Sequence, residues 1–204
     1  MKNKVLIILL FLSNMGIVTA QSIDYQILKD LSKLQSPSDN KFNKFVSDAA
    51  APLSIGAPLL IFGVGLIEKN KDLQEKGFQT GVAFAATLGG TYALKYLVNR
   101  PRPYITHPDL KNLTTEGSPS FPSGHTSSTF SIATSLSLNF RKWYVVVPAY
   151  TWAAATGYSR MYLNVHYPSD VLVGAVLGSG TAWLTWKINK KWREKVLKKK
   201  EMIK

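Results

Sequence analysis

Five stretches that contain no Asp, Glu, Lys or Arg account for most of the sequence after residue 48. They are Ala49–Ile67, Gly77–Leu94, Thr126–Phe140, Trp143–Ser159 and Val171–Trp186. Each has about 15–19 residues, against the roughly 20 that a helix needs to cross a bilayer. Gly and Pro occur within them, which membrane helices tolerate better than soluble ones. The pattern predicts an all-α protein, a bundle of about five to six helices with its core over residues 49–186.

Each stretch is marginal as a membrane span, so the buried helices of a soluble bundle would give a similar pattern. The charges between the stretches help to decide. Basic residues gather in Glu68–Lys76, at Arg141 and Lys142, and after residue 186. The positive-inside rule puts all three on the cytoplasmic side. The connections Lys95–His125 and Ser159–Asp170 then fall together on the outer side, and we favour a transmembrane bundle.

The N-terminus has the features of a secretory signal peptide. Lys2 and Lys4 precede an apolar run over Val5–Leu12, and small residues end at Ala20. Residues 1–20 are therefore predicted to be a signal peptide, with an uncleaved first transmembrane helix as the alternative.

Residues 21–48 are predicted to form an amphipathic extracytoplasmic segment, because apolar residues recur at helical spacing from Ile23 to Leu34. We expect a turn over Ser36–Asn40 and the start of a helix near Ser47 and Asp48.

The formal net charge is +13, and nine of the 25 Lys and Arg residues lie at or after Lys187. No nucleic-acid motif accompanies this basic C-terminal tail, residues 187–204. We interpret it as a cytoplasmic tail against anionic lipid headgroups and do not expect a nucleic-acid partner. The chain has no cysteine, which excludes disulfides and thiolate metal sites.

The segment Gly157–Asp170 holds Arg160, His166 and Asp170 directly before an apolar stretch. Pro168 suits the first turn of a helix, which puts His166 at the helix entrance and Asp170 one turn further on. A carboxylate bound to one imidazole nitrogen leaves the other free as a base or nucleophile. Taken alone, such a pair is more often a helix cap than a catalytic dyad.

Two further segments change that balance. The first supplies Lys95 and Arg102, with prolines that stiffen the chain around Arg102. In the second, Ser123 is placed to cap a helix, Gly124 allows close backbone approach to an anion, and His125 stands beside it. All of these residues map to the outer side. Cations, an anion cradle and two histidines are what in-line phosphoryl transfer requires.

The three motifs K-x6-R-P, P-S-G-H and S-R-x5-H-x3-D, in that order, resemble the type 2 phosphatidic acid phosphatase family. This family shares its helical core with bacterial class A acid phosphatases and vanadium haloperoxidases. The resemblance covers residues 77–186, and all motif letters are present.

The resemblance implies that His166 is the nucleophile and forms a phosphohistidine, with Asp170 orienting it and His125 acting as general acid. It assigns the phosphoryl oxygens to five residues: Lys95, Arg102, Ser123, Gly124 and Arg160. No metal and no cofactor are expected. Vanadate binds the same set of residues in the haloperoxidases, so peroxidase chemistry remains an alternative.

We therefore expect hydrolysis of lipid phosphates or pyrophosphates by a protein of a bacterial-type inner membrane, with its site facing the periplasm or exterior. The alternatives are a soluble secreted acid phosphatase with the same site and a non-enzymatic binder of lipid headgroups. Undecaprenyl pyrophosphate, phosphatidylglycerol phosphate, phosphatidate and lipid A all offer the same reacting group. We assign selectivity to the loop Tyr104–Phe121 and to the acyl-facing groove, and the sequence does not constrain the oligomeric state.

Overall fold

The computed structural model describes residues 22–201, with side chains over residues 22–195. A helix over residues 22–33 precedes the bundle. The bundle consists of α2 (Pro37–Ile67), α3 (Lys71–Val98), the short α4 (Pro103–Thr106), α5 (Gly124–Phe140), α6 (Trp143–Tyr162) and α7 (Pro168–Glu201). The described residues contain no strand, so the prediction of an all-α bundle is confirmed. The predicted signal peptide lies outside the described residues.

Each of the five charge-free stretches forms the apolar part of one long helix, but the helices extend beyond them. The largest difference is at α2, which begins at Pro37. The expected turn over Ser36–Asn40 and the expected helix start near Ser47 are therefore wrong. Ser36 is the N-cap, and its side chain accepts from the Asp39 amide. Polar residues continue a helix as readily as apolar ones once it is capped, so the boundary set at residue 48 lies inside α2.

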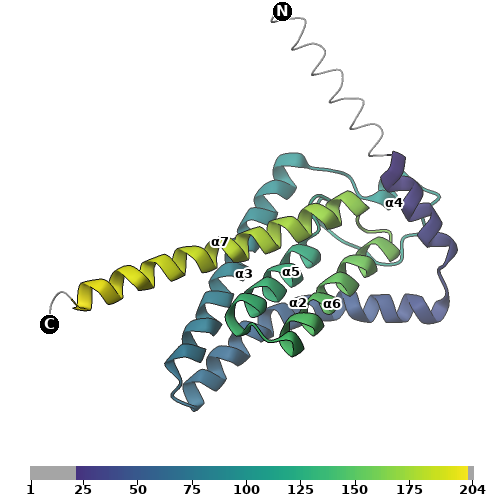
Figure 1. Ribbon diagram of the computed structural model, residues 1–204. Coiled ribbons are helices and arrows are strands. Elements are labelled where there is room, and N and C mark those ends of the chain that lie inside the picture. Colours follow the sequence, from purple (N-terminus) through teal and green to yellow (C-terminus); the bar gives the residue numbers. More distant parts are fainter. Residues whose placement is uncertain (1–21, 202–204) are drawn as a thin grey trace, which may run out of the picture.

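The basic tail likewise does not form a separate segment. Helix α7 runs without a break from Pro168 to Glu201 and carries most of the tail with it. In Figure 1 its yellow end projects well beyond the rest of the bundle.

Helix α5 lies at the centre of the bundle and packs against α2, α3, α6 and α7 (Figure 1). Its buried face consists of small residues, which include Ser127, Ser131 and Ser135. Small side chains let helix backbones approach closely, as is typical of membrane proteins. Their hydroxyl groups are bonded: Ser127 donates to the carbonyl of Ser123, and Thr87 of α3 bonds Ser131 across the interface at 2.9 Å.

The distribution of polarity is the reverse of that in a soluble protein. Serine and threonine fill the interior, whereas large apolar side chains point outward. Leu60, Ile67 and Leu97 are 69%, 83% and 80% exposed. Monomeric soluble proteins rarely show so much contiguous apolar surface. This pattern favours the membrane bundle over the soluble alternative.

Two of the described helices are long and apolar enough to cross a membrane by composition, Pro37–Ile67 and Pro168–Lys195. The Ser and Thr residues on the packing face of α5 lower its mean hydropathy. Neighbouring helices cover those hydroxyl groups, so the polar face of α5 is not exposed to lipid.

The fold brings together the connections that were expected to share a side. One end of the bundle holds a residue from each of three helices: Lys95 near the C-terminal end of α3, Gly124 at the start of α5 and Asp170 at the start of α7. The basic connections around Lys76 and Arg141 lie at the opposite ends of α3 and α5.

The contact between α5 and α7 depends on a glycine. A Cβ at Gly178 would run into the carbonyl oxygen of Ser127, whereas a Cβ at Gly180 on the same helix would have no heavy atom within 4 Å. We expect Gly178→Ala to destabilise the protein by about 1–3 kcal/mol through overpacking. Gly180→Ala is the matched control and should leave stability unchanged or slightly raised. Thermal unfolding in detergent measures both, and equal melting temperatures would contradict the packing argument.

Candidate active site

The three motifs meet around a cavity of about 170 Å³ at the end of the bundle where α3 ends and α5 begins. Five of the eight residues selected from the sequence line it: Lys95, Arg102, Gly124, His125 and His166. The other three, Ser123, Arg160 and Asp170, lie behind its wall and are buried. The structure therefore gathers all eight at one place, and their catalytic roles stay predictions.

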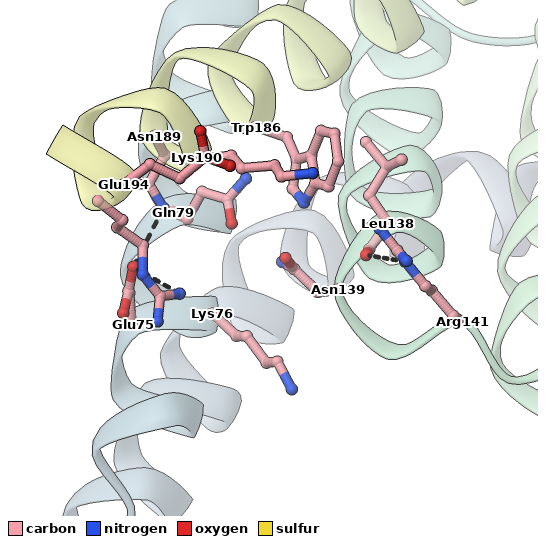
Figure 2. Close-up of a pocket in the computed structure, with 11 residues that line it drawn as sticks. Glu75, Lys76, Gln79, Leu138, Asn139, Arg141, Trp186, Asn189, Lys190 and Glu194 are labelled. Carbon is pink, nitrogen blue, oxygen red and sulfur yellow. Dashed lines mark hydrogen bonds and ion pairs between the residues drawn. The ribbon is translucent and has the colours of Figure 1, made fainter. Parts of the chain in front are cut away.

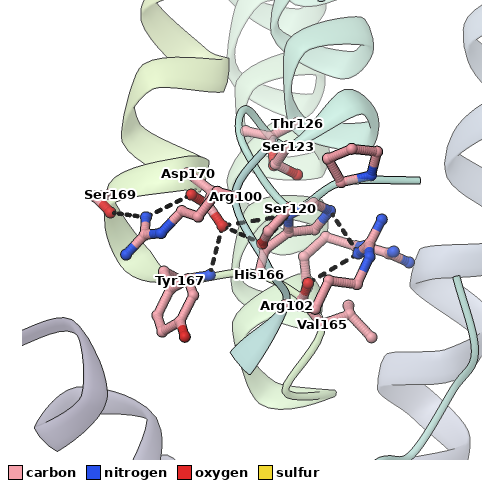
Figure 3. Close-up of polar contacts among 12 residues, drawn as sticks. Arg100, Arg102, Ser120, Ser123, Thr126, Val165, His166, Tyr167, Ser169 and Asp170 are labelled. Atoms are coloured by element: carbon pink, nitrogen blue, oxygen red, sulfur yellow. Dashed lines mark hydrogen bonds and ion pairs between the residues drawn. The ribbon is translucent and has the colours of Figure 1, made fainter. Parts of the chain in front are cut away.

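His166 and Asp170 form a buried pair at the entrance of α7, as the spacing predicted (Figure 3). His166 Nδ1 lies 3.6 Å from Asp170 Oδ2 and 3.5 Å from the Ser120 hydroxyl, which itself donates to Asp170 at 2.5 Å. Two oxygens thus face Nδ1, which favours the neutral tautomer with its proton there. The Nε2 lone pair is then directed away from Asp170 and toward Arg102.

Arg102 is held across the floor of the cavity by backbone oxygens. Its Nη1 donates to the carbonyl of Val165 at 2.8 Å, and its Nε donates to the carbonyl of Ser118 at 2.8 Å. The same Nη1 is 3.3 Å from His166 Nε2. A guanidinium fixed by two carbonyls is aimed at the position next to the imidazole, which suits an oxygen of a bound phosphoryl group.

Glu116 brings a carboxylate to the cavity that the sequence did not suggest. It lies in the loop before α5, bonds Arg160 Nη2 and comes within 3.9 Å of Arg102 Nη2. Burial would raise the pKa of this carboxyl, but the Arg160 charge and hydrogen bond outweigh it and hold the pKa below its ordinary value. The two guanidinium groups therefore converge on one anion in this structure, and that anion is Glu116.

The start of α5 differs in detail from the expectation. Ser123 occupies the N-cap position, but its hydroxyl bonds the Thr126 hydroxyl at 2.9 Å and caps no backbone amide. Its own N–H donates to the carbonyl of Asp170 at 3.0 Å, which ties α5 to α7. Lys95 reaches the loop before α5 and donates to the carbonyl of Pro119 at 2.5 Å.

Arg100 is the largest omission of the sequence-based prediction. It donates to Asp170 Oδ1 at 2.7 Å, and its guanidinium stacks on the Tyr167 ring at 3.8 Å from the centroid. It belongs to the segment with Lys95 and Arg102, but no residue near it in sequence indicates a partner. Only the fold shows that the carboxylate of Asp170 has one oxygen for His166 and Ser120 and the other for Arg100.

Asp24 completes this network from outside the bundle. It lies in the helix over residues 22–33, is 5% exposed and accepts from Arg100 Nη2 at 2.9 Å. It also accepts from the Ser169 amide at 3.0 Å. The N-terminal segment is thus joined to the first turn of α7 and, through Arg100, to the carboxylate beside His166.

Residues 76–194 match the family model described as the PAP2 superfamily. The chain belongs to the PAP2 superfamily. The motif resemblance is therefore confirmed, and the matched region contains all eight predicted site residues but not Asp24.

Among proteins of known function, the lipid A 1-phosphatase of Porphyromonas gingivalis is 28% identical over 168 residues, 81% of this chain and 35% of that protein. The lipid A 4'-phosphatase of Bacteroides thetaiotaomicron is 39% identical over 64 residues, 31% of this chain and 28% of that protein. This chain thus spans about a third or less of either relative. The undecaprenyl-diphosphatase BcrC of Bacillus subtilis is 26% identical over 76% of this chain and 78% of its own length.

Solved structures show the same bundle. The transmembrane PAP2-type phosphatidylglycerolphosphate phosphatase of Bacillus subtilis superposes with a TM-score of 0.72 at 28% identity, over 85% of this chain and 87% of that one. LpxE of Aquifex aeolicus gives 0.70 at 26% identity, over 79% and 93%. A bacterial vanadium-dependent iodoperoxidase shares the fold at 17% identity, with a TM-score of 0.66 over 80% and 48%.

His166 should make the stability of the protein depend on pH. Burial, followed by the charges of Arg160 and Arg102, outweighs Asp170 and lowers the pKa of His166 to about 3, whereas an unfolded histidine titrates near 6.5. As the pH falls, the unfolded state therefore takes up a proton at His166 before the folded state does. The free energy of unfolding decreases for this reason as the pH falls below about 6.5.

We expect the melting temperature of the wild type to fall between pH 7 and pH 5 more steeply than that of His166→Gln, which lacks the titrating ring. Thermal unfolding in detergent over this range measures the difference. Parallel curves for the two proteins would show that His166 is already protonated in the folded state or exposed.

Proposed function

We propose that this protein is a membrane phosphatase that removes a phosphate group from a phosphorylated or pyrophosphorylated lipid. The observation that carries the proposal is the convergence of two histidines and two cationic side chains on one cavity, with Arg160 behind its wall, at one end of a bundle whose outer surface is apolar. A lipid held in the bilayer can present its headgroup at such an end without leaving the membrane. The names of the relatives, which act on lipid A and undecaprenyl pyrophosphate, support the same substrate class.

Binding begins with the replacement of one anion by another. The carboxylate of Glu116 is bonded to Arg160 and lies near Arg102. A phosphoryl group that enters the cavity offers more negative charge and more acceptor oxygens than a carboxylate does, so it displaces Glu116 from these donors. Lys95 and the amides at the start of α5, next to Gly124, hold the remaining oxygens.

Displacement of Glu116 leaves the guanidinium of Arg102 on the phosphoryl oxygens, and the Nε2 lone pair of His166 becomes free to attack phosphorus. The P–Nε2 bond forms while the bond from phosphorus to the lipid oxygen breaks. The negative charge of the bound phosphoryl group favours a proton taken up from solvent on His125, and the protonated ring donates it to the leaving oxygen. Asp170 stabilises the positive charge that develops on the His166 ring. The fixed cations stabilise the charge on the equatorial oxygens.

The second half of the reaction reverses the proton transfer. His125, now neutral, takes a proton from a water molecule as the water oxygen attacks phosphorus. The P–Nε2 bond breaks, inorganic phosphate leaves, and the carboxylate of Glu116 returns to Arg160. No step needs a metal ion, because the guanidinium and ammonium groups provide the charge neutralisation that a metal gives in other phosphatases.

The orientation of the bundle follows from its two ends. The end opposite to the cavity carries Lys76, Arg141 and Lys190, whereas the cavity end carries the loop that precedes α5. By the positive-inside rule the basic end is cytoplasmic. We infer that the protein lies in a bacterial-type inner membrane with its cavity open to the periplasm or exterior.

Replacement of the nucleophile gives the direct test. We expect His166→Asn to lower phosphate release from lipid phosphates by roughly a thousandfold or more, since no covalent intermediate can form. The matched control is His107→Phe, because His107 stacks on Tyr25 outside the cavity and phenylalanine preserves that stacking. Rapid quenching with a substrate labelled at the phosphorus should trap alkali-stable, acid-labile label on the wild type. Label of equal amount on His166→Asn would remove His166 from the mechanism.

The network around Arg100 predicts a second effect, at a residue that does not touch the substrate. Asp24→Asn leaves the charge of Arg100 unbalanced and free to draw Asp170 away from His166, so kcat should fall about tenfold while KM changes little. Asp24→Glu should recover much of the loss. The control is Asp30→Asn on the same helix, where the exposed carboxylate pairs only locally with Lys33 and Gln26. Equal kcat values for Asp24→Asn and Asp30→Asn would contradict the role of Asp24.

A further inference from the structure

A second polar pocket lies at the end of the bundle opposite to the active site. It has a volume of about 370 Å³ and opens between the start of α3, the end of α5 and the middle of α7 (Figure 2). None of the three motifs contributes to it. Its polar and aromatic lining includes Lys76, Gln79, Asn139, Arg141, Trp186 and Lys190.

The two sites are separated by about the thickness of a membrane. Lys76 and Lys95 lie on the same helix, α3, and a rise of 1.5 Å per residue puts them about 28 Å apart. The hydrocarbon core of a bilayer is roughly 30 Å thick. A bundle that has its active site at one membrane surface therefore has this pocket at the other surface, at the level of the lipid headgroups.

Gln79 brings an unpaired side-chain amide to the pocket. Gln79 is 7% exposed and lines the pocket, and its amide makes no hydrogen bond within residues 22–195. Figure 2 shows its side chain beside Trp186 and above Asn139. Because this amide is open to the pocket and not engaged by the protein, its NH2 group is free to donate to an oxygen of a bound anion.

Two cations beside Gln79 are also free of carboxylates. The Arg141 guanidinium and the Lys190 ammonium lie 5.7 and 5.5 Å from the centroid of the Trp186 ring. Neither forms an ion pair in the part of the chain with described side chains. An amide, an ammonium and a guanidinium around one space make a donor set for an anion with several oxygens, such as a phosphate.

The carboxylates of the pocket do not cancel these charges. Glu75 forms an ion pair with Arg193 at 3.0 Å and accepts a hydrogen bond from Asn189 at 3.2 Å. Figure 2 labels Glu75 and Asn189. Glu194 also lines the pocket and is exposed. The internal pairing of Glu75 therefore leaves Arg141 and Lys190 available.

We propose that this pocket binds the phosphate headgroup of an anionic phospholipid in the leaflet opposite to the active site. The shared chemistry would also admit a free phosphate ion, but the surroundings favour a lipid. Phe78 and Ile188 are 67% and 60% exposed, and each is next in sequence to a residue that lines the pocket, on α3 and α7 respectively. Both helices thus carry large exposed apolar side chains at the level of the pocket, where the acyl chains of a lipid bind. The inference rests on the membrane location of the protein and not on its phosphatase activity.

The test compares lipid binding to the purified full chain in detergent by native mass spectrometry. Short-chain phosphatidylglycerol is the anionic probe, phosphatidylcholine is the zwitterionic reference, and inorganic phosphate is added in a third arm. The pocket variants are Gln79→Leu and the double variant Arg141→Ala with Lys190→Ala. Lys187→Ala is the matched control, because Lys187 is one turn away on α7 and lies over Trp183, outside the pocket lining.

We expect both pocket variants to bind phosphatidylglycerol about tenfold more weakly, with binding to Lys187→Ala unchanged. Any lipid bound at the active site contributes equally to all variants, so it does not affect the difference between them. Unchanged phosphatase turnover checks that each variant is folded. An equal loss in Lys187→Ala would overturn the proposal in favour of diffuse attraction to the tail. Full displacement of phosphatidylglycerol by inorganic phosphate, or equal affinity for phosphatidylcholine, would overturn the assignment to an anionic lipid.

Discussion

The carboxylate of Asp170 is the junction on which the site depends. It is completely buried, and its two oxygens accept from Ser120, the Tyr167 amide and Arg100 while one of them faces His166. A buried charge of this kind is tolerated only when it is fully bonded. The partners come from the loop before α4, the loop before α5 and the turn before α7. One side chain therefore fixes three segments that are distant in sequence, and it also sets the tautomer of His166.

The second requirement is close helix packing. The ends of α3, α5 and α7 carry charged and polar groups that must come within a few ångströms of one another, and they do so because the helices below them are lined with small residues. Gly174 of α7 is an example, since a Cβ there would lie 2.8 Å from the carbonyl oxygen of Ser123. The same packing accounts for the modest mean hydropathy of a chain that nevertheless has an apolar exterior. The polarity is inside and bonded, so it costs little in a bilayer.

Much of this could be predicted from the sequence because the information is local. The His166–Asp170 spacing fixes one side chain above the other at a helix start, and charge-free stretches mark the cores of the long helices. The extension of α2 back to Pro37 was missed because charge marks where a helix leaves the membrane, not where it ends. Arg100, Glu116 and Asp24 were missed for a different reason. Their partners lie 44 to 76 residues away in sequence, and periodicity carries no information about such pairs.

The contribution of Asp24 has a practical consequence. The region shared with the rest of the superfamily begins at residue 76, yet an aspartate well before it is bonded to the guanidinium that pairs with the Asp170 carboxylate. A version of this protein trimmed to the shared region would keep every motif residue but would lack Asp24, which helps to position them. Affinity tags and fluorescent fusions are for the same reason better attached beyond the end of α7 than close to the helix that carries Asp24.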